Sequence, residues 1–256
     1  MLNNSDSRPI GVFDSGLGGI SVVREIGRLL PNENIIYIGD NLNNPYGTKS
    51  KDEILRITLD VVDRLIKMNV KAVVIACNTA TSAAVRILRE KYNVPIVGME
   101  PAIKPAVMEN KGGTIGVMAT ISTLKEKKFQ NNMDKFKDIS NIYKIPTQEL
   151  VELVENDIFS GDEINRVLDK HFYEYRDIKF DAIVLGCTHF IFLKDSISDY
   201  FKGIKIYDGN EGTVNRLKNL LMRDDILNYS NQMGKLEIIF TRENDKFKRR
   251  AIDLMK

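Results

Sequence analysis

Short apolar runs closed by small polar residues recur along this chain, and each of them predicts a buried strand. Two runs are the clearest, KAVVIACNTAT at residues 71–81 and FDAIVLGCTHF at residues 180–190. Runs rich in Val and Ile and bounded by small polar residues are typical of parallel strands that are buried on both faces. Further strands are predicted in RPIGVFDSG (8–16), IIYI (35–38), GTIGVMATIS (113–122), IKIYDG (204–209) and LEIIFT (236–241).

Amphipathic stretches with helical spacing lie between these runs. Ser50 and Glu53 form a capping box, and one apolar stripe follows them. Other helices are predicted over residues 20–30, from Gly161 as far as Tyr175, and over residues 213–222. Strands that alternate with helices predict parallel sheets of the α/β class.

The pattern also repeats along the chain. RPIGVFDSG resembles GTIGVMATIS, and each of them is followed by one of the two cysteine-bearing runs. We therefore predict an α/β fold of two similar parallel-sheet domains related by pseudo-duplication, with the active site in the cleft between them. Pro101 and Pro105 interrupt regular structure in MEPAIKPAV, so we expect the boundary between the two halves near this stretch.

Composition excludes several classes of protein. The chain has 256 residues, of which 43% are hydrophobic and 28% charged, and its net charge is +2. This balance gives no electrostatic reason to expect nucleic acid or an anionic membrane as partner. The start, MLNNSDSRP, lacks the apolar segment of a signal peptide, which favours the cytosol. The charged stretch ENDKFKRR (243–250) is expected to be solvated surface.

The only two cysteines, Cys77 and Cys187, are the main candidates for chemistry. Each is expected at the carboxyl end of a strand, where open α/β sheets bind ligands, and directly before a helix. The helix dipole would then lower the thiol pKa, and two activated thiols facing one cleft would form a matched acid and base. Two alternatives remain, namely thiols that only fill a core and thiols that form a disulfide. A thiol–disulfide enzyme is disfavoured because the chain has no CxxC motif.

Two other polar side chains, those of Asp14 and His189, suggest a proton or substrate site. Asp14 precedes the glycine-rich turn of FDSGLGG, where it either caps the next helix or faces the cleft. A phosphate loop is disfavoured there because the turn lacks both GxGxxG and the lysine of a P-loop. His189 lies two residues after Cys187, on the same side of an extended segment, and can take or stabilise a thiol proton. His171 is expected only to pack beside its helix.

A turn-rich loop, GDNLNNPYGTKS, follows the strand at residues 35–38. Its Asn, Pro and Gly residues are ordinary turn formers. The functional interpretation is that the backbone of Tyr46 and Gly47 binds a substrate carboxylate.

Five of these motifs together resemble one family. GVFDSGLGG, NPYGTKS, ACNTAT, MEPAIKPA and LGCTHF, in this order, look like bacterial glutamate racemases of the cofactor-independent Asp/Glu racemase superfamily. The resemblance implies two α/β domains, residues 1–100 with 208–256 and residues 101–207. It also implies an isomerase that interconverts L- and D-glutamate with no pyridoxal phosphate, metal or other cofactor. The resemblance further implies a cytoplasmic enzyme that supplies D-glutamate for peptidoglycan. Its expected partner is the small molecule glutamate, with no nucleic acid or membrane partner, and the candidate assembly is a homodimer.

The resemblance also assigns roles to residues. Cys77 would act on D-glutamate with help from Asp14, and Cys187 on L-glutamate with help from His189. Glu155, in IPTQELVELVEND, would match an assisting glutamate of the family. The glutamate site would consist of Asp14, Ser15, Tyr46, Gly47, Asn78, Thr79, Thr188 and His189.

The chain departs from the family pattern at three places. Thr147 stands where the family usually has Cys, Ile191 stands where it has Pro, and NLNN at residues 41–44 replaces a TARV-like stretch. Two other functions stay open beside glutamate racemisation. One is an aspartate racemase or related superfamily isomerase, and the other is a non-catalytic amino-acid-binding or regulatory protein.

Overall fold

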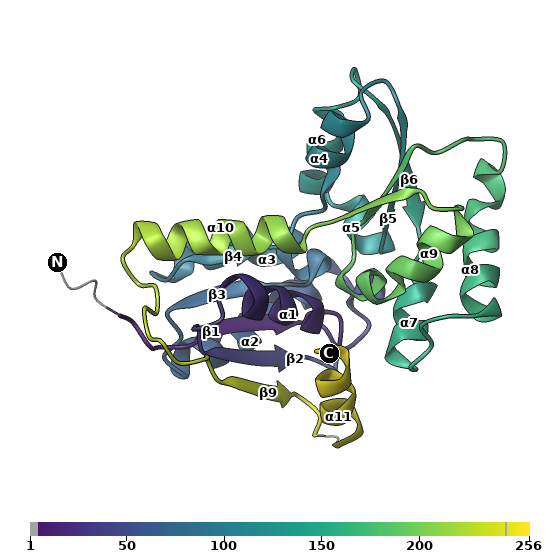
Figure 1. Ribbon diagram of the computed structural model, residues 1–256. Helices are drawn as coiled ribbons and strands as arrows, with labels where there is room; N and C mark the ends of the chain where they lie inside the picture. Colours follow the sequence, from purple (N-terminus) through teal and green to yellow (C-terminus); the bar gives the residue numbers. More distant parts are fainter. Residues whose placement is uncertain (1–4, 244) are drawn as a thin grey trace.

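Two parallel β-sheets, each covered by helices on both faces, make up this computed structural model (Figure 1), which describes residues 5–243 and 245–256. The first sheet has the strand order β4-β3-β1-β2-β9 and the second has the order β6-β5-β7-β8. The strand pairs in the described part of the chain are parallel. The strands are β1 Ile10–Asp14, β2 Ile35–Gly39, β3 Ala72–Ile75, β4 Ile96–Gly98, β5 Thr114–Ala119, β6 Asn141–Pro146, β7 Ala182–Leu185, β8 Lys205–Asp208 and β9 Leu236–Phe240.

The helices divide between the two sheets. Those against the first sheet are α1 Ile20–Leu29, α2 Lys51–Lys67, α3 Asn78–Lys91, α10 Asn210–Arg223 and α11 Asp245–Leu254. Those against the second are α4 Ile103–Glu109, α5 Ile121–Lys125, α6 Lys127–Asp134, α7 Glu149–Glu155, α8 Asp162–Phe172 and α9 Lys194–Tyr200. Three short 3₁₀ helices are η1 Tyr46–Thr48, η2 Tyr173–Tyr175 and η3 Thr188–Leu193.

The two sheets share one plan. In the first, the central strand β1 lies between β2 and β3, and β4 pairs with β3. In the second, β5 lies between β6 and β7, and β8 pairs with β7. Strands β1 to β4 therefore correspond to β5 to β8, and β9 is an addition at the edge. The predicted fold of two similar parallel-sheet α/β halves is confirmed.

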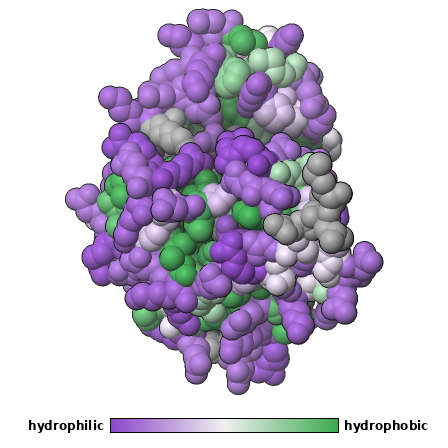
Figure 2. All heavy atoms as spheres, turned by 90° about the vertical axis from the view of Figure 1, so that its left-hand side faces the viewer, coloured by the Kyte–Doolittle hydropathy of each residue, from purple (hydrophilic) through white to green (hydrophobic). Residues whose placement is uncertain are grey.

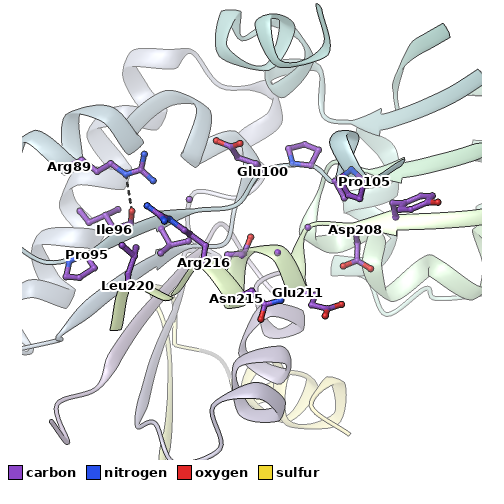
Figure 3. A pocket seen from close by; sticks show the side chains of 18 of the residues that line it. Arg89, Pro95, Ile96, Glu100, Pro105, Asp208, Glu211, Asn215, Arg216 and Leu220 are labelled. Atoms are coloured by element: carbon purple, nitrogen blue, oxygen red, sulfur yellow. Dashed lines mark hydrogen bonds between the residues drawn. The ribbon is translucent and has the colours of Figure 1, made fainter. Parts of the chain in front are cut away.

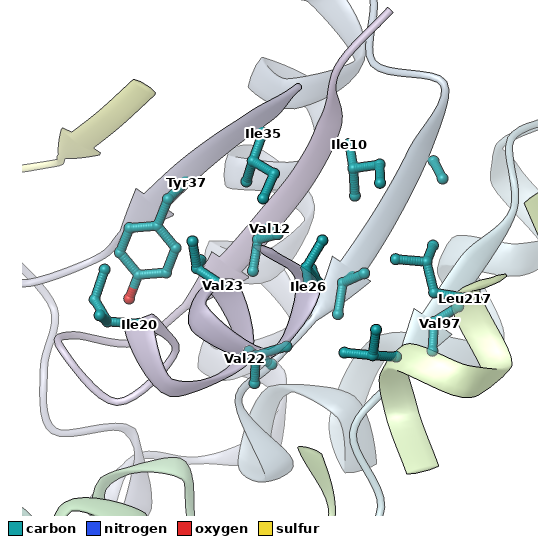
Figure 4. Packing of buried hydrophobic residues seen from close by; sticks show 14 of the residues in the cluster. Ile10, Val12, Ile20, Val22, Val23, Ile26, Ile35, Tyr37, Val97 and Leu217 are labelled. Carbon is teal, nitrogen blue, oxygen red and sulfur yellow. The ribbon is translucent and has the colours of Figure 1, made fainter. Parts of the chain in front are cut away.

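Alternating side chains of the central strand β1 build the two hydrophobic layers of the first half. Ile10 and Val12 pack with α1 and α10, as Ile26 and Leu217 in Figure 4 illustrate. Phe13 points to the opposite face and joins the cluster formed with α2 and α3. Because successive side chains of a strand point to opposite faces, a strand buried on both sides is apolar along most of its length. This is why the sequence of β1 reads as an apolar run that ends at Asp14.

The second sheet follows the same logic. Met118 of β5 faces α7 and α8, whereas Ile115 and Val117 face α4 and α6. Its core is therefore separate from that of the first half, so each half folds around its own apolar layers. The structure thus holds two packed units whose strand ends can meet.

Most of the predicted elements are present, with local differences. Ser50 caps α2, and its hydroxyl accepts a hydrogen bond of 3.3 Å from the amide of Glu53. The helix after Gly161 ends at Phe172, and Tyr175 belongs to η2 instead. Pro105 does not interrupt structure, because it lies in the first turn of α4, where a proline removes no helical hydrogen bond.

The end of the chain returns to the first half. After β8 the chain forms α10, β9 and α11, which pack against the first sheet (Figure 1). The expectation that residues 243–250 are only solvated surface is wrong for Arg250, whose side chain is 11% exposed and contacts Asp157. Residue 244 lies outside the described residues. Arg250 is largely shielded from solvent because α11 packs on the first sheet beside α7 of the other half.

The face drawn in Figure 2 is mainly hydrophilic, with apolar areas lying between the polar side chains. Within the described residues, no helix has both the length and the apolar character needed to cross a membrane.

Candidate active site

Cys77 lies where β3 ends and α3 begins. It is the N-cap residue of α3, its Sγ accepts a hydrogen bond of 3.4 Å from the amide of Ala80, and it is 5% exposed. The predicted position of this thiol is therefore confirmed. The expectation that the helix lowers its pKa is wrong. Burial, reinforced by the charge of Asp14, raises the pKa of Cys77 to about 12, because removing a thiolate from water costs more than the helix amides return.

Cys187 follows β7 in the corresponding position, and it is 8% exposed. The expected α-helix does not begin here. The residues that follow form the 3₁₀ helix η3, closed by a hydrogen bond of 3.2 Å from the amide of Phe190 to the carbonyl of Cys187, and α9 begins only at Lys194. The thiol instead has a side-chain partner, since its Sγ is 3.8 Å from Nδ1 of His189. Both cysteines are free, so the disulfide alternative is excluded for this structure.

The buried His189 and the partly buried Glu155 form a pair next to Cys187. Nε2 of His189 is hydrogen-bonded to Oε1 of Glu155 at 2.6 Å, and the same oxygen accepts a bond of 3.0 Å from the amide of Leu17. Burial lowers the pKa of His189, but its bonds to Cys187 and Glu155 outweigh this effect and raise the pKa well above its usual value. Burial raises the pKa of Glu155, but the bond and charge of His189 lower it further, below its usual value. Both shifts favour the charged forms of the two side chains.

Asp14 ends β1 and reaches both halves of the molecule. Its side chain is fully buried; Oδ2 accepts a hydrogen bond of 3.0 Å from the amide of Gly16, and Oδ1 accepts one of 3.0 Å from the hydroxyl of Thr188. Asp14 is not the cap of α1, which begins after Gly19. Burial raises the pKa of Asp14, and the charge of His189 with these donors acts in the opposite direction. The carboxylate therefore faces the contact between the halves.

The remaining predicted site residues surround the first thiol. Ser15 acts on Cys77 by lowering the pKa of its thiol against the larger effect of burial, and Asn78 is the first residue of α3. Tyr46 begins η1, and its hydroxyl donates to Oδ2 of Asp40 at 2.6 Å. That bond leaves the main chain of Tyr46 and Gly47 as the part that can bind substrate.

Gly47 and Thr79 contact the second half. A Cβ atom on Gly47 would lie 1.8 Å from Oε1 of Gln148, so the close approach of that side chain requires glycine here. The hydroxyl of Thr79 is hydrogen-bonded at 3.0 Å to the hydroxyls of both Thr120 and Thr123. Every predicted site residue therefore lies in or beside the contact between the two halves.

Sequence reasoning missed Thr120, Thr123 and Gln148. The signal for Thr120 was present, because GTIGVMATIS repeats RPIGVFDSG and places Thr120 where the first half has Ser15. Gln148 has no such signal, because its approach to Gly47 joins residues that are far apart in sequence.

A separate cavity of about 1080 Å³ lies between β4, α10 and β8 (Figure 3). Ile96, Arg216 and Asp208 line it, and neither cysteine does. The candidate site is therefore not this hollow but the packed contact at the strand ends. Among residues 5–243 and 245–256, no cluster of three or more His, Cys, Asp or Glu side chains could hold a metal ion.

Comparison with known proteins places this arrangement in one family. A family model described as Asp/Glu/Hydantoin racemase matches residues 10–217. The chain is 48% identical to a glutamate racemase of Clostridium acetobutylicum over 94% of both chains. It is 31% identical to the crystal structure of glutamate racemase from Francisella tularensis in complex with D-glutamate, with a TM-score of 0.85 over 98% of this chain and 94% of that one. The Escherichia coli glutamate racemase in complex with L-glutamate and the activator UDP-MurNAc-Ala gives 30% identity and a TM-score of 0.82, over 97% and 94%.

These matches run through all the motifs at the strand ends, and the resemblance to glutamate racemases that the motifs predicted is confirmed. The chain belongs to the Asp/Glu/hydantoin racemase family.

Proposed function

We propose that this chain interconverts L- and D-glutamate by a two-base mechanism, with Cys77 and Cys187 as the acid and base. The observation that carries the proposal is the placement of the thiols. Both are free and buried, and each ends the equivalent strand of one of two like sheets. Residues next to them meet across the contact, where the Thr188 hydroxyl bonds to Asp14 at 3.0 Å. Inversion of a stereocentre needs one group on each face of the carbon, and this symmetry supplies them.

In the direction from L to D, the thiolate of Cys187 takes the Cα proton and the thiol of Cys77 delivers one to the opposite face. The turnover ends with Cys187 protonated and Cys77 as thiolate, ready for the reverse reaction. The raised pKa of Cys77 supports its part as the proton donor in this direction. A positioned acid or base contributes roughly 10²–10⁴-fold to such a step.

The carbanion that forms needs stabilisation as much as it needs a base. Its negative charge spreads onto the neighbouring carboxylate, so donors fixed around that group lower the barrier. We propose that Ser15, Asn78, Thr79 and Thr188, all of them buried, supply such donors through side-chain or main-chain groups. His189, paired with Glu155, would assist Cys187, and Asp14 would assist Cys77.

Substrate must enter between the halves. The cysteines are 5% and 8% exposed, so the contact has to open before glutamate reaches them. We infer that the moving units are residues 1–100 with 208–256 and residues 101–207, because the chain leaves the second sheet at the end of β8 and returns to the first half in α10. We place the activity in the cytoplasm, supplying D-glutamate to peptidoglycan, with a homodimer as the assembly to test.

Glutamate is the substrate that we propose because the relatives compared above are glutamate racemases, two of which hold D- or L-glutamate. The test is to incubate the purified protein with L-glutamate in D₂O, and to follow optical rotation and deuterium at Cα. We expect racemisation from either enantiomer without pyridoxal phosphate and in the presence of chelator. Turnover of aspartate alone would identify an aspartate racemase, and binding of glutamate without exchange would identify a binding protein.

A further inference from the structure

The C-terminal helix α11 carries one arginine that reaches into the other half. Arg250 ion-pairs with Asp157 through Nε, and its side chain is 11% exposed. Its Nη2 donates to the main-chain carbonyl of Glu155 at 2.6 Å and to that of Val154 at 3.3 Å. The guanidinium also lies 5.1 Å from the centre of the Phe247 ring. A single side chain thus engages three acceptors at the end of α7.

These acceptors lie at the end of α7, next to the candidate proton relay, by which we mean the chain of contacts from Glu155 through His189 to Cys187. The last carbonyls of a helix lack partners within the helix and carry its partial negative charge, so a cation placed there is favourable. α7 ends at Glu155, so Arg250 binds the main chain of the same residue whose carboxylate bonds to His189. That carboxylate also accepts from Leu17 of the first half, at 3.0 Å. Glu155 is therefore held from the first half at two points, its carboxylate and its own carbonyl.

A loop that departs from the family pattern orients the segment before α11. The side chain of Asn41 donates to the carbonyl of Arg242 at 3.0 Å and accepts from the amide of Arg242 at 2.8 Å. Asn41 and Asn44 line a cavity of about 580 Å³ together with Glu155 and Arg250. The NLNN stretch, α11 and the end of α7 therefore form one connected unit beside the relay.

We propose that Arg250 is a positioning residue for the Cys187 side of the reaction, fixing the end of α7 so that Glu155 holds His189 against the thiol. The inference rests on the proposed function. Arg250 touches neither thiol, and its effect runs through Glu155 and His189. Its loss should therefore weaken proton transfer at Cys187 and spare proton transfer at Cys77.

The test separates the two thiols with the D- and L-enantiomers of a 3-substituted glutamate that bears a leaving group. Elimination from these compounds needs only one base, so each enantiomer reports on one thiol. In Arg250→Met we expect elimination from the L-enantiomer to fall at least about tenfold, since small misplacement of a reacting group has effects of this size. Elimination from the D-enantiomer should change much less. Arg250→Lys keeps the charge but not the planar guanidinium. Its rate of elimination from the L-enantiomer should lie between those of Arg250→Met and the unsubstituted protein.

Arg249→Met is the matched control, because it removes the same charge from the same helix at an exposed position. Among the described residues, the Arg249 side chain donates only to the Asp245 carbonyl, at 3.4 Å. It should leave both eliminations unchanged. Equal losses for the two enantiomers in Arg250→Met and Arg250→Lys, or no loss in either variant, would overturn the proposal. If Arg250→Met does not fold, the ratio of the two rates in Arg250→Lys decides. Failure of the proposed function differs from failure of the Arg250 proposal, because in the first case the unsubstituted protein itself would not racemise glutamate.

Discussion

The hydroxyl of Thr188 donates a hydrogen bond of 3.0 Å to the carboxylate of Asp14, and this bond joins the two halves of the molecule beside both cysteines. Asp14 ends the central strand of the first sheet, and Thr188 directly follows Cys187 of the second. Since Asp14 is fully buried, its charge depends on the few donors that reach it. The contact couples the environment of one thiol to the position of the other.

Thr188→Val should therefore reduce kcat/KM for glutamate roughly tenfold to hundredfold in steady-state racemisation assays. The change keeps the shape but removes a hydrogen bond to a charged group, which is worth about 1.5–3 kcal/mol. Thr58→Val is a suitable control, because this threonine of α2 is also buried and its hydroxyl has no partner among the described residues. An unchanged rate in Thr188→Val would show that the bond to Asp14 has no role in catalysis.

Cys77→Ser and Cys187→Ser should each abolish racemisation, by about 10³-fold or more, because a serine hydroxyl is a far weaker acid than a thiol. Each variant keeps one thiol, so single-base elimination should survive selectively. We expect Cys187→Ser to retain elimination from the D-enantiomer of a 3-substituted glutamate, and Cys77→Ser to retain that from the L-enantiomer. If each variant lost both eliminations to the same extent, the assignment of one base to each face would be wrong.

The free energy of unfolding should depend on pH in the alkaline range because Cys77 is buried. Burial and the charge of Asp14 raise its pKa from 9.0 to about 12. Below pH 9 the thiol keeps its proton in both the folded and the unfolded chain. Between about pH 9 and 12 only the unfolded chain releases it, so the free energy of unfolding falls as the pH rises, by at most about 1.4 kcal/mol per unit.

Urea unfolding at several pH values in this window measures the slope. Cys77→Ser should remove the contribution of one proton and flatten the slope relative to the unsubstituted protein. Parallel slopes for the two proteins would mean that Cys77 does not carry the effect.

A buried ion pair far from the thiols should matter for stability alone. Nζ of Lys71 is 2.6 Å from Oε2 of Glu33, and the two side chains are 0% and 2% exposed. Lys71→Met leaves a buried carboxylate without its cation, so we expect the free energy of unfolding to fall by about 3–5 kcal/mol in urea titrations. Lys91→Met, which breaks the exposed pair with Asp63, should cost no more than about 1 kcal/mol. Similar losses in the two variants would contradict this account.

The sequence by itself determined most of the strands, the two like halves and the places of the thiols, but not β4 and β6. These features depend on local patterns: an apolar run that must be buried on both faces, and the polar residue that ends it. Cys77 and Cys187 were therefore placed correctly at the ends of β3 and β7. Glu155, which the family resemblance singled out, indeed lies against His189 at 2.6 Å.

Only the tertiary structure decided how these groups are tuned and held. The local pattern predicts a helix that lowers the pKa of Cys77, yet packing of the two halves removes water from the thiol and raises the pKa to about 12. The contacts of Gln148 with Gly47 and of Arg250 with Glu155 join segments distant in sequence. Periodicity and motif spacing describe neighbours along the chain, whereas desolvation and long-range hydrogen bonds depend on which surfaces the folded halves bring together.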